Sequence, residues 1–287
     1  MNNVKKICVC GAGTMGSGIA QVAAQSGFEV IQFDVKEEML LASEVIIKDG
    51  LKKLVEKQKI TDKQKAEILQ RITFTANIKN CVADIIIEAV VEKKEIKQQI
   101  FDELSLINNS ETVFATNTSS ISVSELSHDK KYATRFAGMH FFNPAQIMKL
   151  VEIICAEKTG NDVIETLVWL AKKFGKTPVV CNDSPGFIVN RVARHYYLEA
   201  MQLVEDGIAD VETIDAIMEA SGFKMGPFKL MDMIGLDVNY SVSNIVWEAL
   251  NKPARLTPSI LQKNKVDAKE LGRKTGKGFY DYKPQTH

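Results

Sequence analysis

The chain has 287 residues, 45% of them hydrophobic and 25% charged, a composition that excludes a disordered or collagen-like protein. At roughly 150 residues per domain, this length predicts two domains. Lysine plus arginine (36) equals aspartate plus glutamate (36), so no overall field attracts nucleic acid or an anionic membrane. No apolar run reaches the length of about eighteen residues that a membrane helix needs, and we expect no signal peptide.

The cysteines indicate the compartment. Five are present, an odd number, and they are scattered without the spacing of a zinc site. Their neighbours are β-branched and apolar, so we expect small buried side chains in a reducing cytosol and no metal site. The sequence therefore predicts a cytoplasmic protein.

A glycine-rich turn separates the first expected strand from the first expected helix. Residues 4–10 are a short β-branched run, Gly11-Ala12-Gly13-Thr14-Met15-Gly16 follows, and a helix is expected over residues 17–25. The next strand, residues 28–33, ends at Asp34, an acid 18 residues after the last of these glycines. A G-x-G-x-x-G turn between strand and helix, followed by such an acid, is typical of a dinucleotide-binding domain.

Each position of the turn has a physical role in dinucleotide binding. Gly11 permits the tight turn, Gly13 lets the backbone approach a pyrophosphate, and Gly16 lets helix and strand pack closely. The phosphates then meet free backbone N–H groups and the positive end of the helix. Thr14 and Met15 are therefore expected to bind the cofactor as well.

Asp34 distinguishes between the two nicotinamide dinucleotides. Its carboxylate would accept hydrogen bonds from the adenosine ribose hydroxyls, and its charge would repel a 2′-phosphate. The sequence therefore predicts NAD rather than NADP, a preference that the nearby Lys36 weakens.

A lysine-rich helical pair interrupts the alternation of strands and helices. Charged helical sequence fills residues 36–70, where a minimal unit has a short connection, and Thr61 can cap the second helix. Residues 48–65 hold seven lysines and three acids, and Lys53 and Lys57 share one helix face. A docking site for a polyphosphate group on the substrate would use such a patch, although an ordinary solvated helix face explains it equally well.

The parallel-sheet pattern resumes at residues 84–92, whose apolar part is of the kind buried on both faces. A helix over residues 94–107 leads to a strand over residues 112–115, which ends in Thr116-Asn117-Thr118-Ser119-Ser120. Ligands of open α/β sheets bind beyond the carboxyl ends of the strands, where these polar side chains fall. Ser119 is thus either a ligand-binding hydroxyl or an ordinary turn residue.

His140 and Glu152 are the candidates for acid–base chemistry. Glu152 lies twelve residues after His140, inside the apolar run 150–154. A charge in that run is costly unless it is paired, and His140 is the obvious partner. A carboxylate fixes the imidazole tautomer and raises its proton affinity, which suits a general base near neutral pH. A core histidine satisfied by hydrogen bonds is the alternative.

A second, all-helical domain is predicted to begin at Ser184. Ser184 can be the N-cap and Pro185 the first residue of a long helix that reaches about Glu205. Asn190 falls inside this helix, where asparagine is a poor helix former, so either a specific hydrogen bond or a surface position explains it. No strand pattern follows before Gly278-Phe279-Tyr280, only helices separated by glycine and proline breaks.

Six segments in register resemble the L-3-hydroxyacyl-CoA dehydrogenase family, most closely its short, stand-alone 3-hydroxybutyryl-CoA dehydrogenases. They are GAGTMGSGIA, DIIIEAVVE, FATNTSS, RFAGMHFFNPAQIMKLVEI, NDSPGFIVNR and KTGKGFYDY. The resemblance runs nearly from end to end. The expected fold class is α/β: a Rossmann-type, mostly parallel sheet domain with an inserted helical pair over residues 1–183, then a smaller all-helical domain over residues 184–287.

The resemblance also implies roles for the matched residues. His140 would be the general base and Glu152 would orient it, while Ser119 and Asn190 would bind the reacting 3-oxygen or the thioester region. Nicotinamide-side or ribose-side contacts to NAD are implied for Glu92, Lys97, Asn117, Ser119, Asn143 and Lys274. The coenzyme A phosphates would meet Lys53 and Lys57.

The implied reaction is the NAD-dependent interconversion of (S)-3-hydroxyacyl-CoA and 3-oxoacyl-CoA with a short acyl chain, by a homodimer formed through the helical domain. One rival is a dehydrogenase of a free sugar acid or hydroxy acid, which would not need Lys53 and Lys57. The other is a non-catalytic NADH-binding structural protein, which the joint presence of Ser119, His140, Glu152 and Asn190 disfavours.

Overall fold

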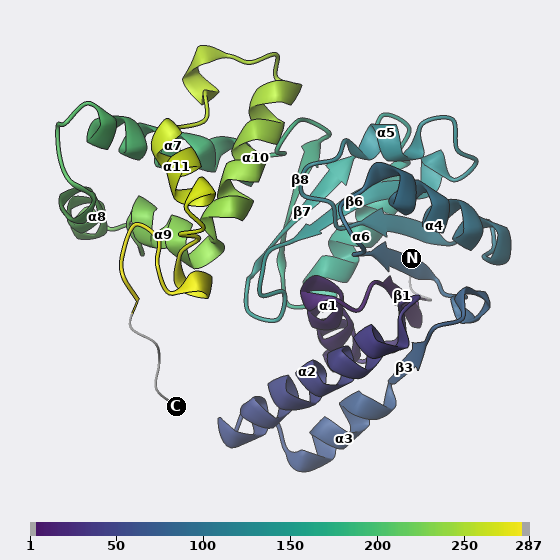
Figure 1. The fold of residues 1–287 in the computed structure, drawn as a ribbon. Helices are drawn as coiled ribbons and strands as arrows, with labels where there is room; N and C mark the ends of the chain where they lie inside the picture. The colour runs from purple at the N-terminus through teal and green to yellow at the C-terminus, as the bar shows by residue number, and fades with distance from the viewer. Residues whose placement is uncertain (1–3, 283–287) are drawn as a thin grey trace. The chain divides into compact units, whose positions relative to one another are not determined.

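The computed structural model describes residues 4–282, which divide between Ser184 and Pro185 into two compact units (Figure 1). The division lies one residue from the boundary expected from the sequence. Among the helices of this part of the chain, none is both long enough and apolar enough to span a bilayer.

The first unit is built on one eight-stranded sheet (Figure 1). Its strands are β1 (Lys6–Cys10), β2 (Glu29–Phe33), β3 (Ile72–Thr75), β4 (Ile85–Glu88), β5 (Val113–Thr116), β6 (Phe136–Phe141), β7 (Leu150–Cys155) and β8 (Thr177–Asn182). Their spatial order is β3-β2-β1-β4-β5-β6-β7-β8, and every neighbouring pair is parallel except β6 with β7. The mostly parallel Rossmann-type sheet expected from the sequence is confirmed, whereas β3 and β8 were not predicted.

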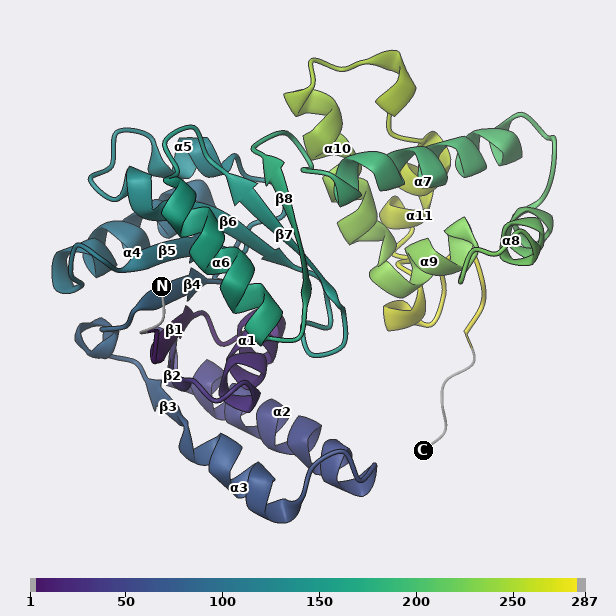
Figure 2. The same ribbon diagram turned by 180° about the vertical axis from the view of Figure 1, so that it is seen from behind.

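Helices cover both faces of this sheet, as the apolar strands require. They are α1 (Thr14–Gln25), α2 (Glu37–Glu56), α3 (Asp62–Gln70), α4 (Lys94–Ile107), α5 (Val123–Ser127) and α6 (Asn161–Lys173), with short 3₁₀ turns at Ile78–Asn80 and Ala133–Arg135. Val9 and Ile87 belong to one core with residues of α1, α2, α3 and α6, and α6 crosses the sheet in Figure 2. On the opposite face, Phe101 of α4 packs edge-to-face against Phe114 and Phe136.

The helices α3 and α1 differ in how well their starts were predicted. Thr61 caps α3 as predicted, in a reciprocal box in which Gln64 N–H donates to Thr61 Oγ1 (3.2 Å) and Thr61 N–H donates to Gln64 Oε1 (2.8 Å). The predicted start of α1 at residue 17 is wrong. The helix begins at Thr14, with Gly13 as N-cap, so the last glycine of the turn already lies inside the helix.

The second unit is helical, as expected. Its helices are α7 (Val189–Glu205), α8 (Val211–Ala220), α9 (Pro227–Ile234), α10 (Leu236–Ala249) and α11 (Ile260–Asp267), with 3₁₀ turns η3 (Ala254–Leu256) and η4 (Arg273–Thr275). Met201, Phe228 and Leu236 lie at the centre of its apolar core. The segment Gly278–Tyr280 is a series of bends and not a strand, and Lys277 beside it forms only isolated bridges.

The predicted start of α7 at Ser184–Pro185 is also wrong. Gly186 and Phe187 both have positive φ (74° and 48°), a left-handed conformation that a right-handed helix cannot include. The helix therefore begins at Val189, and Asn190 lies in its first turn rather than in its interior. The predicted end at Glu205 is correct.

Two buried aspartates bind the last described segment to the second unit through hydrogen bonds. The Asp232 carboxylate accepts hydrogen bonds from the N–H groups of Phe279 and Tyr280 (both 3.0 Å) and from the Tyr282 hydroxyl (2.9 Å). Asp215 accepts from the Tyr280 hydroxyl (2.8 Å). Burial, together with the neighbouring Asp232 carboxylate, raises the pKa of Tyr282 to about 12, so this hydroxyl stays a donor at neutral pH.

Candidate active site

The glycine turn has the shape that a bound pyrophosphate requires. Gly11 has φ of 104°, and a Cβ there would lie 2.5 Å from the Ala89 carbonyl oxygen. A Cβ on Gly16 would collide with the Gly11 carbonyl oxygen, so this position must be glycine for helix and strand to pack. A Cβ on Gly13 would meet nothing within 4 Å, which shows that the backbone there faces open space. Gly11 and Gly16 thus have the geometry expected of a tight turn and of close packing, and the approach of a pyrophosphate to Gly13 stays a prediction.

The start of α1 and the end of β2 supply the remaining features of a dinucleotide site. No side chain caps the first turn of α1, so the N–H groups around Thr14 and Met15 keep their capacity to bind an anion. The Asp34 carboxylate accepts hydrogen bonds from Ala12 N–H (2.9 Å) and Lys36 N–H (3.0 Å), which hold it at the carboxyl end of β2. These residues fit NAD.

A buried ion pair lies at the carboxyl end of β4. Lys97, from α4, is 1% exposed, donates to Glu88 (2.6 Å) and forms a second ion pair with Glu92 (3.1 Å). Thr116 Oγ1 and Val90 N–H also donate to Glu88, each at 2.7 Å. Burial raises the pKa of Glu88, and the Lys97 ammonium opposes this shift.

Glu88 was not recognised as a site residue from the sequence. It closes the apolar run Ile85–Ile87, where a charge needs a partner for the same reason as at Glu152. Lys97 was predicted only as a cofactor contact, whereas the structure shows that it is also the counter-ion of a buried acid.

Glu92 organises the turn that carries Ser119. One oxygen of its carboxylate accepts from the Thr118 hydroxyl (2.5 Å), from Ser119 N–H (3.0 Å) and from Ser120 N–H (3.2 Å). Burial alone would raise the pKa of Glu92, but the Lys97 ammonium and these donors hold it below the ordinary value. Glu92 is therefore a charged anchor for residues 118–120 as well as a predicted cofactor contact.

Replacing Glu92 with glutamine should loosen this turn. The amide keeps the shape but loses the charge that strengthens its hydrogen bonds, so we expect hydrogen-exchange protection of the Ser119 and Ser120 amides to fall several-fold. Because the folded-state pKa of Glu92 is lowered, its stabilising effect in the natural chain is complete above the ordinary carboxyl range and is lost as pH falls through the lowered value. Unchanged protection would refute the anchoring role, and Glu95→Gln, on exposed α4 surface, is the control.

His140 and Glu152 face each other across the antiparallel pair β6–β7. They are directly opposite in register, and His140 Nδ1 lies 2.7 Å from Glu152 Oε2. Both are buried, at 5% and 1% exposure. A carboxylate accepts the bond, so Nδ1 of the neutral ring carries the proton and Nε2 is its basic nitrogen. The predicted pairing of these two residues is confirmed.

The other predicted residues lie in several places. Asn117 follows β5, and its Oδ1 accepts from Phe141 N–H (2.8 Å), which ties it to the end of β6. Asn143 is exposed just beyond β6. In the second unit, Lys274 is paired with Asp237 (2.5 Å), a bond that outweighs the effect of burial and lowers the pKa of that acid.

The lysine patch is exposed. Lys53 lies in the last turn of α2 and Lys57 is its C-cap, and neither forms an ion pair with an acid of the described chain.

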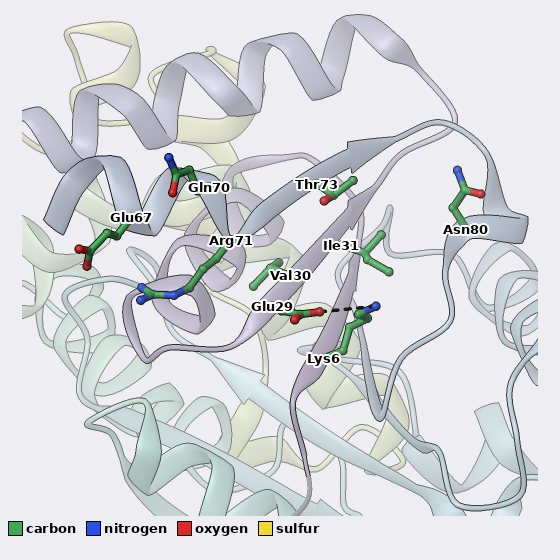
Figure 3. Close-up of a pocket in the computed structure, with 9 residues that line it drawn as sticks. All are labelled: Lys6, Glu29, Val30, Ile31, Glu67, Gln70, Arg71, Thr73 and Asn80. Atoms are coloured by element: carbon green, nitrogen blue, oxygen red, sulfur yellow. Dashed lines mark ion pairs between the residues drawn. The ribbon is translucent and has the colours of Figure 1, made fainter. Parts of the chain in front are cut away.

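A cavity of about 560 Å³ is lined by none of the predicted site residues (Figure 3). Its lining consists of Lys6, Glu29, Val30, Ile31, Glu67, Gln70, Arg71, Thr73 and Asn80. Lys6 and Glu29, which are paired at 3.5 Å, are the first residues of β1 and β2. The cavity is thus at the amino ends of the strands, whereas ligands of such sheets bind at the carboxyl ends.

Comparison with known proteins agrees with this geometry. Residues 6–184 match the NAD binding domain of 3-hydroxyacyl-CoA dehydrogenase, and residues 186–282 match its C-terminal domain. The chain is 41% identical to the 3-hydroxyadipyl-CoA dehydrogenase of Escherichia coli K12, covering 99% of this chain but only 60% of that protein. It is 42% identical to a probable 3-hydroxybutyryl-CoA dehydrogenase of Deinococcus radiodurans, covering 96% of this chain and 100% of the relative.

Solved structures are similar over the whole chain. The (S)-3-hydroxybutyryl-CoA dehydrogenase of Ralstonia eutropha superposes with a TM-score of 0.94 at 35% identity, covering 98% of this chain and 100% of that one. With the family matched across both units and the glycine turn shaped for a dinucleotide, the cofactor is NAD. The chain belongs to the 3-hydroxyacyl-CoA dehydrogenase family and is an oxidoreductase with an NAD-binding Rossmann domain followed by a helical C-terminal domain.

Proposed function

We propose that this protein interconverts (S)-3-hydroxyacyl-CoA and 3-oxoacyl-CoA with NAD, on short acyl chains, with His140 as general base and Glu152 as its orienting partner. The observation that carries the proposal is the buried 2.7 Å bond between these side chains on facing strands. The names of the relatives support the substrate class, since they refer to 3-hydroxybutyryl-CoA and 3-hydroxyadipyl-CoA.

The proton chemistry follows from the tautomer. In the oxidative direction His140 Nε2 removes the proton of the 3-hydroxyl, and Glu152 stabilises the imidazolium that forms. In the reductive direction the protonated ring donates to the 3-keto oxygen. Bound NAD supplies the hydride acceptor or donor. General acid–base help of this kind contributes about 10²–10⁴-fold to the rate.

The remaining site residues bind and orient. The turn from Gly11 to Gly16 would hold the pyrophosphate and Asp34 the adenosine ribose. Glu92, Lys97, Asn117, Ser119, Asn143 and Lys274 would contact the nicotinamide side of the cofactor. Ser119 and Asn190 would also hold the 3-oxygen or the thioester region of the substrate.

The test is NADH oxidation with acetoacetyl-CoA, followed by nicotinamide absorbance, with NADPH in parallel. Rapid consumption of NADH and slow consumption of NADPH would support both the substrate class and the role of Asp34. Rapid consumption of NADPH would refute only the prediction that Asp34 selects NAD over NADP. Tight NADH binding without turnover would refute the proposed substrate and favour a free hydroxy acid or a non-catalytic role.

We assign the coenzyme A phosphates to Lys53 and Lys57. The double variant Lys53→Met/Lys57→Met should raise KM for acetoacetyl-CoA by about tenfold and leave kcat unchanged, because exposed contacts to phosphate contribute modest binding energy each. Added salt should raise the KM of the natural chain more than that of the variant, since exposed charges are screened. Lys131→Met, also exposed but outside the patch, is the control, and an unchanged KM in the double variant would refute the assignment.

The helical unit is the proposed dimer interface. Large apolar side chains are exposed on it, including Ile208 (70%), Ile217 (61%) and Ile260 (58%), and a second copy would cover such surface. Light scattering should therefore give about twice the chain mass of 31.9 kDa.

All five cysteines are free thiols, which supports a reducing compartment such as the cytoplasm.

A further inference from the structure

A buried arginine on α7 has no role in the chemistry described above. Arg194 is 3% exposed, and its Nη1 donates to Asn239 O (2.7 Å), Asn239 Oδ1 (3.3 Å) and Ser243 Oγ (2.8 Å) on α10. Its Nε donates to Asn190 O (3.1 Å), and its guanidinium lies 4.9 Å from the centre of the Tyr197 ring. Every one of these partners is neutral.

The charge of Arg194 is therefore uncompensated. No carboxylate of the described chain lies within ion-pair distance of it, in contrast to Lys97, which has two. Burial lowers the pKa of Arg194 to about 10, so the guanidinium is still charged at neutral pH. A buried charge without a counter-ion costs several kcal/mol, which an anionic ligand would offset.

Arg194 and Asn239, whose side chains are joined by a hydrogen bond, each have an unused donor. A guanidinium has five N–H groups, and the Nη2 nitrogen of Arg194 donates to no residue of the described chain. Asn239 Nδ2 is buried and likewise lacks an acceptor. Asn239 Oδ1 accepts from both Arg194 and Gln262 Nε2 (2.9 Å), so the orientation of this amide is fixed with its donor unused. Such a cluster offers hydrogen bonds to an acceptor with negative charge.

Arg194 lies one helical turn from Asn190, which is a predicted substrate contact. It lies four residues after Asn190, on the same helix face and about 6 Å further along the axis. The bond from Nε to Asn190 O shows that the side chain runs back toward Asn190, as side chains on helices do. Under the proposed function Asn190 holds the 3-oxygen or the thioester, so Arg194 is one turn from the reacting part of the acyl chain.

We propose that Arg194, with Asn239, binds a carboxylate at the far end of the acyl chain. The preferred substrate is then a 3-hydroxyacyl-CoA whose chain ends in a carboxylate rather than a methyl group. The carboxylate accepts from Arg194 Nη2 and Asn239 Nδ2 and neutralises the buried guanidinium. The inference rests on the proposed function and narrows its substrate class.

The first test compares two substrates with the natural protein. 3-Oxoadipyl-CoA and 3-oxohexanoyl-CoA both have six-carbon acyl chains and differ only in the carboxylate or methyl end. We expect kcat/KM to be at least about tenfold higher for 3-oxoadipyl-CoA, because the carboxylate meets donors that a methyl group leaves unpaired. Equal values, or a preference for the methyl-ended chain, would overturn the inference.

The second test is Arg194→Met. It should lower kcat/KM for 3-oxoadipyl-CoA by about a hundredfold and leave 3-oxohexanoyl-CoA within about threefold, since only the carboxylate needs the charge. Arg194→Lys keeps a charge without the planar fork and should retain part of the preference. Arg255→Met, which removes an exposed charge on η3 of the same unit, should change neither value.

The results of these tests distinguish failure of carboxylate binding at Arg194 from failure of the proposed function on which it rests. Equal loss with both substrates in Arg194→Met would show a structural role in joining α7 to α10 and would overturn the inference. If that variant does not fold, Arg194→Lys and the substrate preference of the natural protein still decide the question. Turnover of acetoacetyl-CoA without a carboxylate preference overturns the inference alone. Absence of turnover with all three substrates overturns the proposed function as well.

Discussion

Replacing His140 with glutamine should lower kcat with acetoacetyl-CoA by about 10²–10⁴-fold while the affinity for NADH stays the same. Glutamine fills a similar volume and keeps a hydrogen bond to Glu152, but it cannot accept and return a proton. The side chain lies on β6, outside the glycine turn and away from Asp34, so the features that fit NAD are not altered. Steady-state rates and a fluorescence titration with NADH measure the two effects.

A matched control is available in the same unit. His128 is 66% exposed at its side chain, and His128→Gln should change neither value. Turnover within a few-fold of the natural protein in His140→Gln would show that His140 is a core histidine and not the base. Loss of NADH affinity together with turnover would instead indicate that the substitution disturbs the fold.

Replacing Lys97 with methionine should destabilise the chain by about 3–5 kcal/mol at neutral pH. The substitution leaves Glu88, which is fully buried, without its principal counter-ion. Urea denaturation without NADH measures this effect apart from the role of Lys97 as a predicted cofactor contact. Lys94→Met is the control on the same helix, because its ion pair with Glu125 is exposed and its loss should cost less than about 1 kcal/mol.

The loss of unfolding free energy in Lys97→Met, called here the deficit, should change with pH in one direction. Burial already raises the pKa of Glu88, and loss of the ammonium raises it further. An acid with a raised folded-state pKa costs stability once pH rises above its unfolded value, and this cost disappears when the group is protonated in both states. The deficit should therefore shrink as pH falls toward the ordinary carboxyl range. A deficit that is constant with pH would indicate lost packing and not an unpaired charge.

Local sequence signals predicted much of the Rossmann unit. The apolar run before Glu88 was predicted as a buried strand, and the cap at Thr61 was placed correctly because both rest on neighbouring residues. The pairing of His140 with Glu152 was predicted from the cost of a charge in an apolar strand, and the register of β6 and β7 brings them opposite each other.

Three other features, the strand β8, the start of α7 and the partners of Arg194, depend on contacts between residues that are distant in the sequence or on backbone conformation. The strand β8 contains Val179 and Val180, but both are exposed and no residue of β8 is buried, so no pattern of burial marks it, and it forms by pairing with β7. The Ser-Pro signal at residues 184–185 was overridden by the left-handed backbone at Gly186 and Phe187. The partners of Arg194 lie 45 and 49 residues along the chain, beyond the range of any helical periodicity.

The hydrogen bonds that Asp232 accepts from the last described segment affect the order in which the chain folds during synthesis. Asp232 receives its donors from residues 47, 48 and 50 positions further along the chain. Until those residues leave the ribosome, burying the Asp232 carboxylate costs free energy, because these three donors are not yet available to it. The sheet unit, whose strands are all made earlier, is able to fold first, as domains generally do. The helical unit then gains its full set of hydrogen bonds to Asp232 only after residues 279–282 have been made.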